Sequence, residues 1–283
     1  MSILIHPGTY VVAVSGGVDS VVLLDYMAGH PEYKLIVAHF DHGIRDDSHE
    51  DEMFVRSLAE KYGLPFESKR EELGKRASEE LARCRRYAFL RLVAKKHGAL
   101  IATAHHADDA VETIAINLIR GTGWRGLAVL DSDIIRPLLD MGKQEILDYA
   151  TSHNLQWHED STNASDTYLR NRIRRKTTDL SADEKQQLLG LRAHQIGLKH
   201  QIANEVKGIV GEEPTYSRYM FTHCSQATSI ECLRIITQGR LTRPQLNRAL
   251  LAIKTNLPGT KFEAGNSVIF RFTSRIFEVE LIK

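Results

Sequence analysis

Two hydrophobic periods alternate along the first half of the chain, and together they predict strands and helices in turn. Apolar, strand-like runs cover residues 10–14, 34–39 and 99–104, with a short run near Phe66. Helical patterns occupy residues 20–28, 48–62, 78–97, 108–119 and 142–153. Strands that alternate with helices indicate an α/β fold with a doubly wound parallel sheet. Ligands of such sheets bind beyond the carboxyl ends of the strands.

The pattern changes near residue 182. Helical segments are predicted at 182–208, 226–237 and 243–255, and alternating strands at 260–264, 267–272 and 276–282. Short turns at Gly265-Asn266 and Thr273-Ser274 join these strands. The sequence therefore predicts two domains, a larger one at residues 1–183 and a smaller α+β domain at 184–283.

A glycine-containing loop, Ser15-Gly16-Gly17-Val18-Asp19-Ser20, follows the first strand and opens the first helix. Glycines let backbone N–H groups approach an anion, and the helix N-terminus adds partial positive charge. Asp19 is a candidate magnesium ligand. No lysine precedes Ser20, so the loop is not a Walker A motif. It resembles the PP-loop of ATP pyrophosphatases, which cleave ATP to AMP and pyrophosphate. The alternative is a tight turn with a serine cap.

Polar residues also follow two other strands, where the sheet should bring them to the same crevice. Asp41 is a candidate to join Asp19 on magnesium, whereas His39 and His42 are more typical of hydrogen bonding in a polar loop. The segment His105–Thr113 is denser in polar side chains, which are His105, His106, Asp108, Asp109 and Glu112. Their spacing suits helix capping, magnesium binding, a cationic substrate or proton transfer from an amine.

Two basic segments are candidates for phosphate contact. Arg83 and Arg86 belong to a helix without acids from Leu81 to His97, and residues 170–176 carry five basic side chains and no acid. A solvated basic surface is the structural alternative; ATP or an RNA backbone is the functional one.

Composition narrows the class of protein. The formal net charge of the 283 residues is +1, so any nucleic-acid surface must be local. Cys84, Cys224 and Cys232 form no CxxC pair, which argues against a disulfide framework or a four-ligand zinc site. Neither a signal peptide nor a membrane span is visible. We expect a soluble cytoplasmic protein whose oligomeric state is open, with a homodimer as one alternative.

Taken together, the motifs resemble those of the bacterial tRNA(Ile)-lysidine synthetases. The matching stretches are SGGVDS (15–20), HFDHGIR (39–45), ARCRRY (82–87), TAHHADDAVET (103–113), RGTGWRGL (120–127), RPLL (136–139) and DSTNASDTYLRNRIR (160–174). This resemblance implies a PP-loop catalytic domain, like the adenine nucleotide alpha hydrolases, at 1–183. The second half resembles only loosely the small tRNA-binding C-terminal domain of compact members. The further C-terminal domain of long members is expected to be absent.

The resemblance implies a ligation. ATP would adenylate the 2-oxo group of the wobble cytidine in tRNA(Ile) with a CAU anticodon, and free L-lysine would displace AMP to give lysidine. Residues Ser15, Gly16, Gly17, Val18, Asp19 and Ser20 would hold ATP, with Mg²⁺ on Asp19 and Asp41. The implied catalytic residues are Asp19, Asp41, His105, Asp109 and Arg174. The implied substrate-binding residues are Arg83, Arg86, His105, Asp109, Glu112, Arg170, Asn171, Arg172 and Arg174.

Three alternatives remain open at this level. A related class on the same fold activates a tRNA base and then delivers sulfur, but it usually needs a catalytic cysteine pair or a cysteine-held cluster. Synthetases fed by a glutaminase would need an additional domain. A non-catalytic RNA-binding module would not need Asp19, Asp41, Asp109 and Glu112 together.

Overall fold

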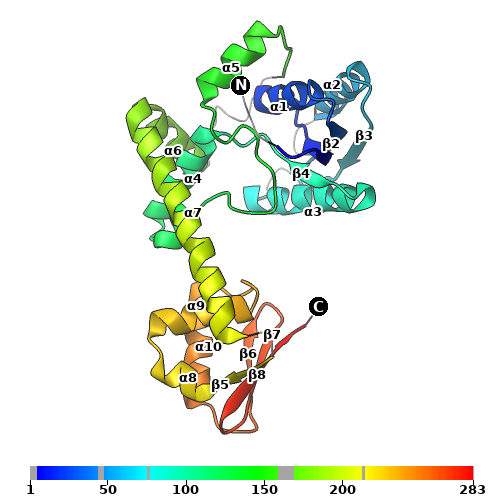
Figure 1. The fold of residues 1–283 in the computed structure, drawn as a ribbon. Coiled ribbons are helices and arrows are strands. Elements are labelled where there is room, and N and C mark those ends of the chain that lie inside the picture. The colour runs from blue at the N-terminus through cyan, green and yellow to red at the C-terminus, as the bar shows by residue number, and fades with distance from the viewer. Residues whose placement is uncertain (1–4, 44–47, 75–76, 159–168, 212–213, 283) are drawn as a thin grey trace. The chain divides into compact units, whose positions relative to one another are not determined.

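The computed structural model describes residues 5–43, 48–74, 77–158, 169–211 and 214–282 (Figure 1). The chain forms two compact units, Met1–Gln195 and Ile196–Lys283. The dividing point lies inside helix α7 (Ala182–Val210), so this helix contributes to both units. The domain boundary expected after residue 183 stays a prediction.

The first unit contains a parallel sheet with the strand order β3-β2-β1-β4. Its strands are β1 (Gly8–Ala13), β2 (Tyr33–Asp41), β3 (Phe66–Arg70) and β4 (Leu100–Ala102). The run predicted at 99–104 is thus regular strand only at its centre, where Ala102 also forms a parallel bridge to Ile135. The predicted doubly wound α/β fold is confirmed.

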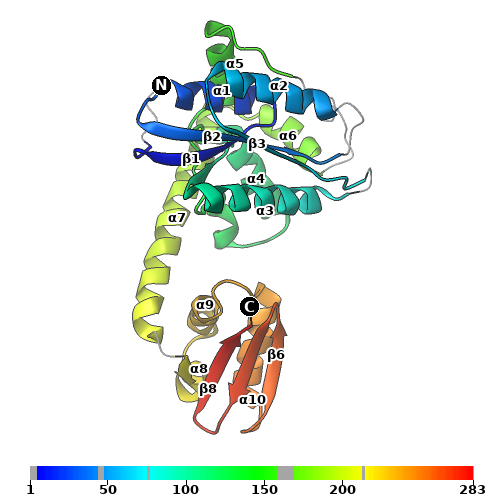
Figure 2. The ribbon, with the colours of Figure 1, turned by 90° about the vertical axis from the view of Figure 1, so that its right-hand side faces the viewer.

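Helices cover both faces of this sheet (Figure 2). Tyr10 and Val12 of β1 pack on one face in the same apolar cluster as α1, α2 and α5, whereas Val11 packs on the other face with α3. The helices are α1 (Val18–Ala28), α2 (Ser48–Lys61), α3 (Glu79–His97) and α5 (Lys143–Ser152). Both faces of the strands are therefore buried, which explains why these strands read as continuous apolar runs.

A third apolar cluster joins helices that lie beside the sheet. Ala110 and Ile114 of α4 (Ala107–Ile119) are buried with Val129, and Leu188 and Leu189 of α7 pack against them. The short 3-10 helix η1 (Trp124–Leu127) and helix α6 (Leu169–Thr178) also contact α4. The first turns of α7 and the basic helix α6 are thereby placed against the helix that follows β4 (Figure 1).

The second unit is an antiparallel sheet of order β5-β8-β7-β6 packed on helices. Its elements are β5 (Thr215–Ser217), α8 (Arg218–His223), α9 (Gln226–Ile236), α10 (Arg243–Thr255), β6 (Lys261–Gly265), β7 (Val268–Phe272) and β8 (Ile276–Leu281). Alternate β7 residues Val268, Phe270 and Phe272 are buried in the core. The sequence analysis missed β5 and α8, each too short to show a period. Within the described ranges, no helix combines the length and apolar character that a membrane span needs.

Asp25 joins three helices on one face of the parallel sheet. Its carboxylate accepts hydrogen bonds from the hydroxyls of Tyr62 at 2.6 Å and Tyr149 at 2.9 Å. Asp25 lies in α1, Tyr149 in α5, and Tyr62 directly after α2. Burial, and then the hydrogen bond to Asp25, raise the pKa of both tyrosines above the ordinary value.

We predict that Tyr149→Phe lowers the free energy of unfolding by about 0.5–1.5 kcal/mol. It should also weaken the loss of stability at alkaline pH. A folded-state pKa raised above the unfolded value of about 10 gives stability that is full below that pH and lost as the pH rises toward the folded value. Denaturant titrations at several pH values above neutrality measure both effects. Tyr219→Phe, at a 71% exposed tyrosine, is the control, and parallel alkaline slopes for Tyr149→Phe and the wild type would contradict the prediction.

Candidate active site

The candidate site lies where the strand order of the parallel sheet changes direction. The chain proceeds from β1 to β2 and β3 on one side, and β4 pairs with the opposite side of β1. The loops that follow adjacent strands on opposite sides of such a point diverge and leave a crevice between them. Here those loops are residues 14–17 after β1 and Thr103–His106 after β4. The glycine loop and the polar segment that begins at His105, two of the three polar clusters expected to meet, are therefore neighbours.

Ser20 organises the glycine loop from within. Its buried hydroxyl accepts the N–H groups of Ser15 at 3.1 Å and Gly16 at 3.2 Å, and donates to the Gly17 carbonyl at 2.8 Å. Gly16 has a φ of +98°, where an L side chain would be strained. The Ser15 side chain is exposed. Ser20 thus shapes the loop, and the exposed Ser15 hydroxyl, which lies 3.3 Å from Ser20 Oγ, is the one that an anion could reach.

Asp19 lies in the first turn of α1 and forms an ion pair with Lys143 Nζ. His106 Nε2 is 4.0 Å from the other carboxylate oxygen. Lys143 is the first residue of α5, and its backbone N–H donates to Asp108 Oδ2 at 2.8 Å. Asp108 Oδ1 in turn accepts Lys185 Nζ at 2.7 Å. Alternating acids and cations therefore connect α1, α5, α4 and α7.

The sequence analysis missed Lys143 and Lys185. The sequence did contain a hint that Lys143 has a role besides helix formation. The helix dipole disfavours a cation in the first turn of a helix, so a lysine at this position indicates another interaction. Burial opposes ionisation of Asp108, but the hydrogen bonds from Lys185 and the Lys143 N–H outweigh it and lower the pKa of Asp108. This carboxylate is therefore held in its charged form.

Asp109 caps α4 through contacts with His106. Its Oδ2 accepts the His106 N–H at 3.1 Å and lies 3.5 Å from His106 Nε2. The capping interpretation of the acidic segment thus holds for Asp109 in this structure. The carboxylate also contributes electrostatically to His105 and Arg174.

His105 is held as a neutral imidazole. Its Nδ1 lies 2.9 Å from the Thr103 hydroxyl. Burial lowers the pKa of His105 to about 3; Asp109 acts in the opposite direction, while the positive charges of Arg83 and Arg136 add to the decrease. A ring nitrogen of His105 is thus a candidate proton acceptor in a crevice that also contains carboxylates.

Arginines gather on the α3 side of His105. Arg83 and Arg86 stack over the Tyr87 ring, with guanidinium-to-centroid distances of 4.9 and 5.6 Å. Arg136 comes directly after Ile135, the residue that forms the parallel bridge with Ala102 of β4. Its guanidinium donates to the carbonyls of Leu130 and Ile134. The sequence motif RPLL (136–139) by itself gives no role to its arginine. All three guanidinium groups lie near enough to His105 to act on it electrostatically.

The basic helix α6 meets α4 through Arg174 and Glu112. Arg174 Nε donates to Glu112 Oε1 at 2.6 Å, and Glu112 is only 2% exposed. Burial works against the charge of Arg174, but Glu112, with Asp109 and Asp19 nearby, raises its pKa overall. Arg172 is exposed on the same helix. Arg170 and Asn171 also belong to α6, but their side chains lie outside the described part of the structure.

Asp41 has a different set of partners from Asp19. It ends β2, and its buried carboxylate accepts the Gly43 N–H at 2.8 Å and the Ser48 hydroxyl at 3.0 Å and pairs with Arg70 at 3.2 Å. Among the described residues, no group of three or more His, Cys, Asp and Glu side chains is arranged to hold a metal ion. A metal shared by Asp19 and Asp41 stays a prediction.

The two histidines near Asp41 differ in burial and partners. His39 is buried, with Nδ1 2.9 Å from the Val14 carbonyl. Burial and the nearby Arg86 lower the pKa of His42. The hydrogen bond of His39 agrees with the interpretation of these residues as parts of a polar loop.

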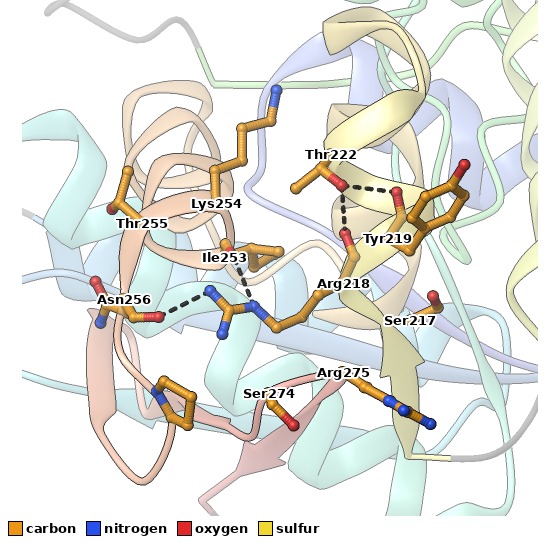
Figure 3. A pocket seen from close by; sticks show the side chains of 11 residues that line it. Ser217, Arg218, Tyr219, Thr222, Ile253, Lys254, Thr255, Asn256, Ser274 and Arg275 are labelled. Atoms are coloured by element: carbon orange, nitrogen blue, oxygen red, sulfur yellow. Dashed lines mark hydrogen bonds between the residues drawn. The ribbon is translucent and has the colours of Figure 1, made fainter.

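A separate cavity lies in the second unit (Figure 3). Arg218 donates to the carbonyls of Ile253 at 2.9 Å, Asn256 at 2.8 Å and Thr273 at 2.9 Å, and so closes the end of α10. Exposed Lys254 and Arg275 also line this cavity. No residue expected at the active site belongs to it.

The fold and the loop define a nucleotide-binding α/β protein built around a phosphate-binding turn. Residues 5–180 match the family described as PP-loop domain, more than half of the chain, and the protein therefore belongs to the PP-loop family.

Curated relatives of the chain carry one recurrent description. The tRNA(Ile)-lysidine synthase of Geobacter sulfurreducens is 42% identical over 187 residues, which are 60% of this chain and 40% of that protein. The tRNA(Ile)-lysidine synthase of Thermotoga maritima is 38% identical over 191 residues, 62% of this chain and 46% of that protein. The chain thus spans less than half the length of these curated relatives.

A solved structure supports the fold alone. The U34-tRNA thiolase NcsA from Methanococcus maripaludis superposes with a TM-score of 0.58 at 19% identity, over 69% of this chain and 73% of that one.

The neutral state of His105 has a measurable consequence. Its pKa is about 3 in the folded protein and about 6.5 when unfolded, so acid protonates the unfolded chain first. The contribution of His105 to stability is present above pH 6.5 and is lost as the pH falls toward 3. We predict that His105→Asn flattens the decrease in unfolding midpoint between pH 7 and pH 5. His49→Asn, at an exposed histidine of α2, is the control. An unaltered acid profile in His105→Asn would show that the ring is not kept neutral.

Proposed function

We propose that the protein is an ATP-dependent tRNA(Ile)-lysidine synthetase that joins lysine to the wobble cytidine of a CAU anticodon. One observation carries the proposal. In a PP-loop chain about 40% identical to lysidine synthases, the glycine loop with Asp19 meets the acidic end of α4, and the basic helix α6 is bound to α4 through Arg174. Groups suited to phosphate, amine and RNA would thus share one crevice.

The first half-reaction uses the loop. The cytidine 2-oxygen attacks the α-phosphorus of ATP, the bond to the bridging oxygen breaks, and pyrophosphate leaves with the electron pair. The backbone N–H groups at the start of α1, together with the Ser15 hydroxyl, would hold the phosphates, while the Ser15 and Gly16 N–H groups stay bonded to Ser20 Oγ. The N-terminus of α1 favours their negative charge.

Mg²⁺ fits this loop through Asp19. The ion is usually bound by one or two carboxylates together with substrate phosphates, and it would offset the charge of the leaving pyrophosphate. Asp19 lies beside the loop, whereas Asp41 would first have to exchange the Ser48 and Arg70 contacts of its carboxylate. Asp19 is therefore the better candidate.

The second half-reaction uses the α4 side of the crevice. Asp109 would hold the lysine ammonium, and the amine must lose a proton before it attacks C2 and displaces AMP. The low pKa of His105 makes it a weak base in the free protein. An anion bound near Arg83 and Arg136 would cancel part of the field that lowers this pKa. Substrate binding would thereby raise the basicity of His105 at the step that needs it.

RNA contact is assigned to exposed basic side chains. Arg172 and Lys176 are exposed on α6, beside the crevice that Arg174 borders. We extend the proposal to the C-terminal region, expected at 184–283 to bind tRNA, where Lys254 and Arg275 line the cavity of Figure 3. Because the overall charge is near zero, such local patches must supply the affinity for phosphate.

Base thiolation by the same fold is the second candidate, and the cysteines disfavour it. Cys84 is exposed, Cys224 is half-buried, and Cys232 is buried in the second unit. Burial raises the pKa of Cys232 to about 11, which removes thiolate character. A non-catalytic RNA-binding module is disfavoured by the ordered loop and the acids that face it.

The proposal predicts a defined product. Incubation with ATP, lysine and tRNA(Ile) should release pyrophosphate and AMP and give a nucleoside heavier than cytidine by lysine minus water, detected by mass spectrometry. Asp19→Ala should lower pyrophosphate release at least ~10²-fold because it removes a group that stabilises the reacting charge. Asp148→Ala, at an exposed aspartate of α5, should behave as the wild type. A sulfur-containing nucleoside, or wild-type turnover by Asp19→Ala, would overturn the assignment.

Two arginines of α6 give a matched test of RNA binding. Arg172→Ala should weaken tRNA binding and reduce the slope of log affinity against log salt by about one unit or slightly less, with unfolding unchanged. Arg174→Ala should instead lower the free energy of unfolding by about 1–3 kcal/mol because it leaves the buried Glu112 carboxylate without this donor. Binding titrations at several salt concentrations and denaturant unfolding separate the two. Equal effects of both substitutions on both measurements would contradict this division of roles.

A further inference from the structure

The phosphate loop contains no cation of its own. Residues 15–20 include no lysine or arginine, although the leaving group of the proposed reaction is a polyanion. Lys143 supplies a cation at this place from a distant part of the chain. Its Nζ contacts Asp19 in the first turn of α1, across a sequence separation of 124 residues.

The position of Lys143 is fixed by its backbone rather than by its side chain. Its N–H donates to Asp108, and Glu145 caps the preceding Gly142 N–H at 2.8 Å. The Ala107 N–H also donates to the Met141 carbonyl at 2.9 Å and ties the start of α4 to the same segment. The start of α5 is therefore held in place even if the lysine side chain moves.

The helix itself does not favour a positive charge at Lys143. At the first position of α5 the helix dipole disfavours a positive charge. Lys143 is half-buried, and its flexible stem carries three donors that can turn from one anion to another. Pairing with Asp19 compensates both charges while no phosphate is present.

We infer that Lys143 is a catalytic residue that exchanges Asp19 for the oxygens of the departing pyrophosphate when ATP binds. This inference rests on the proposed function. As the bond between the α-phosphorus and the bridging oxygen breaks, the electron pair goes to pyrophosphate, and the Lys143 ammonium stabilises that charge. The exchange would also leave an Asp19 oxygen able to hold Mg²⁺. A charge contributed by α5 thus takes the place of the lysine that the loop lacks.

The alternative role is that of a counterion that only keeps Asp19 compensated. The two roles differ in what happens after ATP binds. A counterion would affect the nucleotide-free protein and leave turnover intact, whereas a phosphate ligand acts on the transition state and lowers kcat.

The test compares Lys143→Ala and Lys143→Arg with Lys96→Ala. Lys96 forms a 2.6 Å ion pair with Glu67 on an exposed part of the same unit and is the matched control. We expect Lys143→Ala to lower kcat for tRNA-dependent pyrophosphate release by about 10²-fold or more. Lys143→Arg should recover part of that loss because it keeps the charge, and Lys96→Ala should match the wild type.

A second measurement is independent of turnover. The rise in unfolding midpoint on addition of MgATP should be smaller in Lys143→Ala than in the wild type and Lys96→Ala, because a ligand that binds more weakly stabilises less. Wild-type kcat together with a wild-type ATP-induced shift in Lys143→Ala would overturn the inference and leave Lys143 as a counterion. If the wild-type protein released no pyrophosphate, the proposed function would fail, and the ATP-induced shift would still decide whether Lys143 meets nucleotide.

Discussion

The site depends most on the pair of hydrogen bonds that the Asp108 carboxylate accepts. This carboxylate lies in the first turn of α4, accepts the backbone N–H of Lys143 at the start of α5, and accepts the ammonium of Lys185 from α7. Helices α4, α5 and α7, which come from separate parts of the sequence, are thereby held together around the Asp108 carboxylate. Hydrogen bonds from charged or backbone donors to a carboxylate are among the stronger ones in proteins. The position of the Lys143 side chain at Asp19, and hence the charge balance of the phosphate loop, follows from this arrangement.

The crevice is built from charges that compensate one another before any substrate enters. Asp19 pairs with Lys143, Asp108 with Lys185 and Glu112 with Arg174, while His105 stays neutral beside arginines. Under the proposed function, each group would therefore have a partner to exchange when a phosphate or an ammonium ion arrives. When a ligand binds, the free-energy cost of removing water from the charged groups is smaller at such a site than at a site with unpaired charges. The reason is that the ligand replaces an existing ionic contact.

Periodicity predicted most of the fold, because the sheet is buried on both faces and each helix has an apolar side. The strands around Val12 and Val37 and the helices after them were found where their patterns lie. Residues next to strand ends were also predicted, since chain order places them there. Lys143 was not, because its contact with Asp19 joins residues 124 apart, and no local pattern encodes such a contact. The hydrogen bonds of the Ser20 hydroxyl within the loop, and the contacts of Asp41 with Ser48 and Arg70, also depend on the folded structure and could not be predicted from the local sequence.

The end of helix α10 has a consequence for how the second unit folds. The carbonyls of Ile253 and Asn256 near that end are satisfied by Arg218, which lies 35 and 38 residues earlier in the chain and also binds the Thr273 carbonyl. Local glycine caps let a helix end by itself, but this end is completed only after α8 and the β7–β8 turn have reached it. We therefore expect the last turn of α10 and the turn after β7 to open and close together. In hydrogen exchange, their amides would share a common opening free energy despite their separation in the sequence.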